Sequence, residues 1–118
     1  MARTRPRRHG RPPRAVLILA AYPRRPAAER AASLLVRERL VACATVVGGA
    51  RAVYVWKGRR HIQASTLLYG KTTAARAREA VRRIRETHPD QVSEILVLDI
   101  VGGNAEYLAW IAEEVGRR

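Results

Sequence analysis

Four side chains in this sequence belong to the types that bind soft divalent metals, one thiol and three imidazoles: Cys43, His9, His61 and His88. Copper and zinc sites usually gather two to four such ligands at one point, and no two of these residues stand at close ligand spacing. Cys43 follows an apolar helical pattern, which favours a small buried hydrophobe, and His88 precedes a proline at a helix end. We retain Cys43 and His88 as the candidate metal ligands, and we expect Cu²⁺ or another divalent cation to bind weakly.

A second set combines aromatic rings with one ammonium and one carboxylate: Tyr54, Trp56, Lys71, Glu94, Tyr107 and Trp110. Tyr54 and Trp56 are two residues apart in a strand pattern, and Tyr107 and Trp110 are three apart in a helical pattern, so each pair shares a face. A pair formed by Lys71 and Glu94 would hold an anionic or carboxylate-bearing ligand. We predict that the six residues line a ligand cleft. The alternative is that the rings pack at subunit boundaries, where Tyr and Trp are enriched.

Catalytic arrangements are missing from the sequence. Ser, His and Asp do not occur in a nucleophile pattern, and the single cysteine lies outside any nucleophile motif. The glycine pairs Gly48–Gly49 and Gly102–Gly103 are not followed by Lys-Ser or Lys-Thr at the spacing of a phosphate-binding loop. We therefore predict that the protein is not an enzyme.

The charge is strongly positive and unevenly spread. The 118 residues carry 23 Lys and Arg against 10 Asp and Glu, a net charge of +13. Residues 1–14 are rich in Arg and Pro without acid or apolar periodicity, so we predict a disordered tail there and one domain over residues 15–118. A basic chain attracts nucleic acid. Because Arg replaces Lys nearly everywhere, coding composition also explains the bias, and nucleic acid is expected only through the basic tail.

The apolar run Ala15–Ala21 follows this Arg-rich segment, as in a signal peptide. About seven residues are too few to span a bilayer, and the same run is needed as the first strand. The single cysteine excludes an intrachain disulfide and fits a reducing compartment. We therefore predict a cytoplasmic protein without membrane insertion.

The elements that position these side chains follow the order β-α-β-β-α-β-α. Strands are predicted over 15–21, 44–56, 62–69 and 94–101. Helices are predicted over 26–40 and 74–87, and a short third helix, capped by Asn104, ends at about Val115. The glycines at 48 and 49 predict a bulge or a sharp bend inside the second strand. The first six elements form the split β-α-β pattern of the ferredoxin-like sandwich, an α+β fold with two helices on one sheet face and, here, an extra C-terminal helix. The other face is apolar, so oligomerisation is expected to cover it.

Five short segments occur together in the order and spacing of a known family: Leu40–Val47, Tyr54–Gly58, His88–Pro89, Glu94–Leu98 and Gly103–Ile111. Over about residues 15–115 the sequence resembles the CutA divalent-cation tolerance proteins. The resemblance implies a PII-like homotrimer in which long bent strands of neighbouring subunits pair edge to edge. It also implies a role in the response to divalent metal ions, copper especially, with clefts between subunits as the ligand or signalling sites.

The sequence departs from the family pattern in its hairpin and third strand. That stretch is commonly acidic in the family, whereas this chain has no carboxylate from Lys57 to Arg78. Such a basic surface repels divalent cations. The tyrosine that often follows the His-Pro pair is replaced by Asp90.

Two other modules share this order of elements and stay open as alternatives. One is a nucleic-acid-binding domain, although the segment 62–69 lacks the RNA-recognition motif. The other is a small-molecule regulatory domain of the amino-acid-binding kind.

Overall fold

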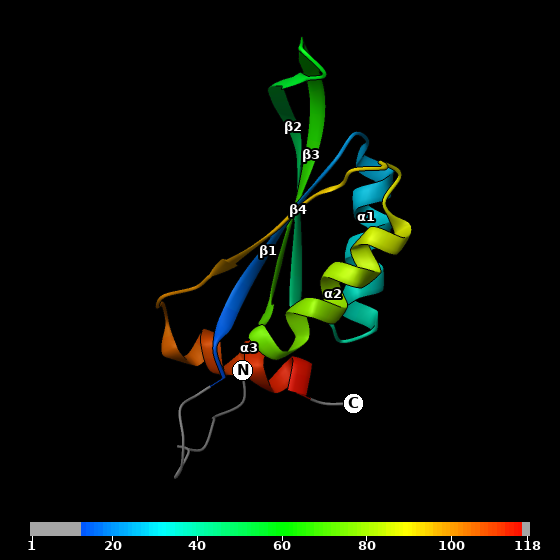
Figure 1. The fold of residues 1–118 in the computed structure, drawn as a ribbon. Coiled ribbons are helices and arrows are strands. Elements are labelled where there is room, and N and C mark those ends of the chain that lie inside the picture. The colour runs from blue at the N-terminus through cyan, green and yellow to red at the C-terminus, as the bar shows by residue number, and fades with distance from the viewer. Residues whose placement is uncertain (1–12, 117–118) are drawn as a thin grey trace.

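A computed structural model describes residues 13–116 as one sheet with three helices (Figure 1). The elements are β1 (Ala15–Tyr22), α1 (Arg25–Arg37), β2 (Cys43–Trp56), β3 (Arg59–Thr73), α2 (Ala74–Thr87), β4 (Glu94–Asp99) and α3 (Ala105–Gly116). This order matches the prediction at every element.

The four strands form a sheet in the order β2-β3-β1-β4, with all neighbours antiparallel. Helices α1 and α2 lie on one side of it (Figure 1). Alternate residues of β1, namely Val16, Ile18, Ala20 and Tyr22, are buried and meet the buried stripes of the two helices. The predicted ferredoxin-like α+β fold is therefore confirmed.

The core consists mainly of aliphatic side chains, with Tyr22 as an aromatic member, and the sequence contains no Phe. Ile18, Leu35, Leu68 and Ile84 are at most 1% exposed and pack in one cluster. Burying such a side chain stabilises the fold by roughly 1.5–3 kcal/mol. This layer joins β1 and β3 to both helices and fixes the frame on which the candidate residues stand.

Helix α1 ends at Arg37, three residues before the predicted end. Arg39 takes a positive φ of 58°, while the N–H of Leu40 donates to Leu35 O and that of Arg39 donates to Val36 O. This is a Schellman ending, in which a left-handed residue stops the helix although its apolar pattern continues. The buried Leu40 therefore belongs to the cap.

Strands β2 and β3 form a ribbon that extends past the helices (Figure 1). A bulge between Val47 and Ala50 confirms the prediction from the two glycines, and Gly49 has a φ of +79°. Lys57 and Gly58 both have positive φ, as a two-residue hairpin turn with the right twist requires. β3 is longer than predicted at both ends, which lengthens the ribbon. The aromatic residues of β2 therefore stand on its projecting part.

The termini of the domain differ slightly from the prediction. The predicted tail over residues 1–12 lies outside the described residues. Arg14, placed in that tail, belongs to the domain, since its carbonyl accepts the N–H of Ala74 and its Nε lies 3.3 Å from Asp99 Oδ1. Asn104 caps α3 as predicted, through its Oδ1 and the N–H of Glu106. Among residues 13–116, no helix is both long enough and apolar enough to cross a membrane.

Candidate functional site

The six residues of the predicted cleft fall into two groups within one chain. We call residues that pair directly across neighbouring strands a row. Lys71 lies in the row of Leu17 and Leu98, whereas Glu94 lies in the row of Ala21, four residues farther along β1. Four rows span about 13 Å along the strands, too far for an ion pair. Both residues nevertheless lie on the sheet face opposite α1 and α2, which we call the open face.

The first group surrounds Lys71 and is called the lysine cluster: Lys71, Cys43, Thr45, Tyr107 and Trp110. Lys71 pairs with Cys43 across β2 and β3, and its Nζ donates to Thr45 Oγ1 at 2.6 Å and lies 3.8 Å from Cys43 Sγ. Tyr107 and Trp110 come from α3, with ring centroids 5.6 Å apart. Burial raises the pKa of Tyr107, and the Cys43 side chain raises this pKa further through its negative charge as a thiolate and through a hydrogen bond.

The lysine cluster has the chemistry of an anion site. It offers an ammonium and two hydroxyl groups, which suit a carboxylate or a phosphate. The thiol stands beside the ammonium, and this positive charge opposes binding of a divalent cation. Thr45 was not singled out from the sequence, although its two-residue spacing from Cys43 places both on one face of β2.

The second group lines an open groove of about 670 Å³, which we call the ribbon groove. One wall comes from the projecting ribbon and the other from the segment before β4. Its lining residues are Ala21, Tyr22, Pro23, Ala52, Val53, Tyr54, Trp56, Gln63, Ala64, Ser65, Asp90, Gln91, Val92 and Glu94. It therefore contains three predicted cleft residues, Tyr54, Trp56 and Glu94.

The two aromatic rings of the ribbon groove are held by their neighbours on the ribbon. Tyr54 stacks on His61 with centroids 5.1 Å apart and donates a hydrogen bond to Gln63 Oε1. Trp56 is 48% exposed, and Lys57 Nζ lies 6.0 Å from its ring centroid. The rings are thus positioned, and the described residues leave them partly exposed.

His88 has a structural role at the end of α2. Its Nδ1 accepts the N–H of Asp90 at 3.0 Å, so the proton is on Nε2, which donates to Ala21 O at 2.7 Å. The ring also stacks on Tyr22 with centroids 4.3 Å apart. Both nitrogens are therefore engaged. Since Cys43 lies in the row of Lys71 at the other end of the sheet, the two candidate metal ligands do not converge within one chain.

Over the described part of the chain, residues 13–116, no group of three or more His, Cys, Asp or Glu side chains is placed to hold a metal ion. A metal site that uses these side chains would need further ligands from outside residues 13–116 of one chain.

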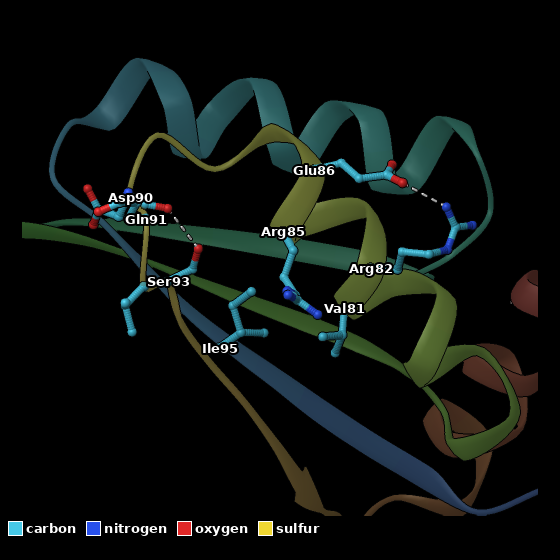
Figure 2. A pocket seen from close by; sticks show the side chains of 9 residues that line it. Val81, Arg82, Arg85, Glu86, Asp90, Gln91, Ser93 and Ile95 are labelled. Atoms are coloured by element: carbon cyan, nitrogen blue, oxygen red, sulfur yellow. Dashed lines mark hydrogen bonds and ion pairs between the residues drawn. The ribbon is translucent and has the colours of Figure 1, made fainter.

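A second hollow of about 530 Å³ lies between α2 and β4 (Figure 2). Figure 2 shows Arg82 bonded to Glu86, at 2.9 Å, and Ser93 donating to the carbonyl of Asp90, at 3.3 Å. Arg82, Glu86 and Ser93 are thus held by hydrogen bonds within this segment of the chain. Asp90 lines both hollows, so the segment 90–93 separates this one from the ribbon groove.

Tyr22 carries a buried hydroxyl that has no hydrogen-bond partner among the described residues. Burial raises the pKa of Tyr22 to about 12, from an ordinary value of 10.0. The unfolded chain therefore loses this proton first, and stability falls as pH rises from 10 to 12. We expect Tyr22→Phe to raise the free energy of unfolding by about 1 kcal/mol at pH 7. The gain should widen at pH 11, as urea unfolding at both pH values would measure; equal midpoints for the two proteins would contradict it.

Comparison with known proteins finds one family throughout. The family model of the CutA1 divalent ion tolerance proteins matches residues 16–114. The divalent-cation tolerance protein CutA of Pectobacterium atrosepticum is 34% identical over 97 residues, which cover 82% of this chain and 88% of that protein. The crystal structure of CutA from Xylella fastidiosa is 35% identical, with a TM-score of 0.83 over 86% of this chain and 97% of the other. The structure of the divalent cation tolerance protein from Thermus thermophilus is 36% identical, with a TM-score of 0.82 over 85% and 97%.

Proposed function

The chain belongs to the CutA1 divalent ion tolerance protein family, and from this premise we propose that it serves divalent-cation tolerance as a non-enzymatic homotrimer. The proposed ligand or signalling site is a cleft between subunits. The observation that supports it best is the apolar surface of the open face and the ribbon, which residues 13–116 of one chain leave exposed.

This surface exposes several large apolar side chains. Val53 and Val55 on the ribbon are 62% and 69% exposed, and Leu96 and Leu98 on β4 are 52% and 44% exposed. β4 is also an edge strand, with unpaired backbone groups on its outer side. The two valines belong to the face of the sheet that the helices cover farther along, and the two leucines to the open face. Exposed apolar side chains on both faces, next to a free edge, favour association with further copies of the chain.

Association also gives a reason for the divided cleft. The lysine cluster and the ribbon groove occupy opposite ends of one open face. In the proposed trimer, the lysine cluster of one subunit faces the ribbon groove of its neighbour, so that Lys71 and Glu94 contribute to one site. The predicted pairing of these two residues then occurs between chains.

The proposed ligand of the lysine cluster is anionic, and direct cation binding is weak. No carboxylate lies between Lys57 and Arg78, and the Lys71 ammonium stands beside the Cys43 thiol. We place the protein in the cytoplasm, where the thiol stays reduced. The central position of β1 in the sheet supports this, because removal of the run as a signal would take away the strand that pairs with both β3 and β4.

Calorimetry with Zn²⁺ and with Cu²⁺ tests the cation part of the proposal. Zn²⁺ is included because it does not oxidise thiols. Wild-type protein is expected to bind weakly, and Cys43→Ala to remove that binding. Lys71→Met keeps the aliphatic stem and removes the charge, so it should strengthen binding at least tenfold, about 1.4 kcal/mol. Equal binding by wild type and Cys43→Ala would exclude the thiol as a ligand.

A further inference from the structure

The layer formed by α1 and α2 carries much of the positive charge of the domain. The segments 24–39 and 74–87 contain ten Arg and four Glu and no other charged residue, a net charge of +6. Each carboxylate of these segments lies between 2.8 and 3.9 Å from an Arg nitrogen: Glu29, Glu38, Glu79 and Glu86. The negative charges of this layer are therefore neutralised within it, and an approaching anion meets the excess of arginine.

Half of the arginines in the helix layer are exposed and unpaired. Among residues 13–116, five of the ten have neither a hydrogen bond nor an ion pair: Arg24, Arg30, Arg37, Arg78 and Arg85. Arg30 and Arg37 are seven residues apart on α1, which places them on one side of the helix with about 10 Å between them. Arg78 and Arg85 have the same spacing on α2. We call these four residues the arginine surface.

The two helices hold the arginine surface on the side of the sheet away from the open face. α1 and α2 lie side by side there (Figure 1), and Arg83 Nη2 on α2 lies 2.8 Å from Glu38 Oε2 at the end of α1. Arg30 and Arg37 are on the side of α1 opposite its buried stripe. Arg85 lines the hollow on the other flank of α2 (Figure 2). The arginine surface thus extends over both helices.

The composition of the helix layer fits a polyanion of phosphates better than other anionic partners. The planar guanidinium group binds phosphate with two parallel hydrogen bonds. Neither helix contains an aromatic residue, and proteins that bind single strands need such rings for stacking on bases. Of the large hydrophobic side chains in these segments only Val36 is exposed, at 44%, so the layer has no apolar face to insert into a membrane.

We propose that the arginine surface binds the phosphate backbone of double-stranded nucleic acid, without reading its sequence. The sequence predicted contact with nucleic acid only through the basic tail, and the helix layer is a second basic surface within the folded domain. Each phosphate that an Arg neutralises releases counterions, so the affinity falls steeply as salt is added. Because the arginine surface lies opposite the open face, this inference does not depend on the proposed trimer or its cleft.

Fluorescence anisotropy of a labelled DNA duplex of random sequence, titrated with the full chain, tests the proposal. Arg30→Gln/Arg37→Gln removes two charges and no hydrogen bond or ion pair within residues 13–116. In about 0.1 M NaCl this variant should bind at least about tenfold more weakly than wild type. The slope of log K against log salt should also fall by about 2, since each phosphate contact contributes about 0.9. Arg78→Gln/Arg85→Gln should give the same changes.

Arg59→Gln/Arg60→Gln is the matched control, since it removes two exposed charges beside the hairpin turn of the ribbon. It should weaken binding by less than about threefold and leave the salt slope unchanged. The basic tail is the same in all variants, so it does not contribute to the difference. Equal losses for the helix and ribbon variants would overturn the proposal, because positive charge anywhere on the chain would then suffice.

Two further probes and the mass of the variants complete the test. Tighter binding of single-stranded DNA than of the duplex would overturn the proposal. Binding of anionic lipid vesicles that is as tight as that of the duplex, and that the helix variants weaken equally, would assign the surface to a membrane and overturn it too. By light scattering the helix variants should keep the wild-type mass, and a changed mass would place these arginines in the assembly instead. A monomeric wild type that loses duplex binding through the helix variants alone would remove the proposed trimer and support this inference.

Discussion

Replacing Leu96 and Leu98 with aspartate is expected to convert the protein from a trimer into a monomer. Both side chains point to the open face, in the rows of Leu19 and Leu17, and both are about half exposed in the single chain. Burying an unpaired carboxylate at a subunit boundary costs several kcal/mol, and this cost opposes assembly of the variant. Multi-angle light scattering should give three times the 13.2 kDa chain mass for wild type and the chain mass itself for the variant.

Val36 supplies a control of equal exposure. Val36 on α1 and Leu98 on β4 are each 44% exposed, but Val36 lies in the helix layer on the other side of the sheet. Val36→Asp should leave the mass at that of wild type, while Leu98→Asp alone should already shift it toward the monomer. A monomeric wild-type protein would refute the proposed assembly, and dissociation by Val36→Asp would show that the open face is not the specific boundary.

The fold was predictable from the sequence because its signals are local. The apolar run of β1, the helical spacing of Ala28, Ala31 and Leu35, and the glycines before Ala50 each specify an element within a few residues. Boundaries depended on contacts that periodicity does not encode. The left-handed Arg39 ends α1 early, and pairing along the ribbon extends β3 beyond its apolar pattern.

The candidate site was harder to predict because it depends on register. The common face of Lys71 and Glu94 and their separation by four rows both follow from the pairing of β3 and β4 with β1. The bulge adds a second difficulty. Because of the bulge, Tyr54 and Thr45 share a face of the sheet although one residue number is even and the other is odd. Their pairing partners on β3, His61 and Tyr69, are both odd-numbered.

His88→Ala is expected to destabilise the protein by roughly 2–4 kcal/mol. It removes two hydrogen bonds, worth about 1 kcal/mol each, and a stacked ring pair worth about 0.5–1.5 kcal/mol, and it opens a cavity beside Tyr22. His61→Ala is the matched control, because His61 contacts Tyr54 on the projecting ribbon and should change stability by less than about 0.5 kcal/mol. Urea unfolding at one fixed protein concentration measures both, since association contributes to stability.

The same pair of variants decides between the two interpretations of His88. If its ring nitrogens hold Ala21 O and the N–H of Asp90, as the geometry indicates, the loss of stability is present without any metal and Zn²⁺ binding is unchanged. If His88 were a metal ligand, His88→Ala would give the reverse result. The metal-free variant would lose little free energy of unfolding, and the enthalpy of Zn²⁺ binding would disappear. The segment 90–93 depends on the same bonds, so His88→Ala should also loosen the wall that separates the ribbon groove from the hollow beside α2. The imidazole thereby links the end of α2 to the geometry of the groove.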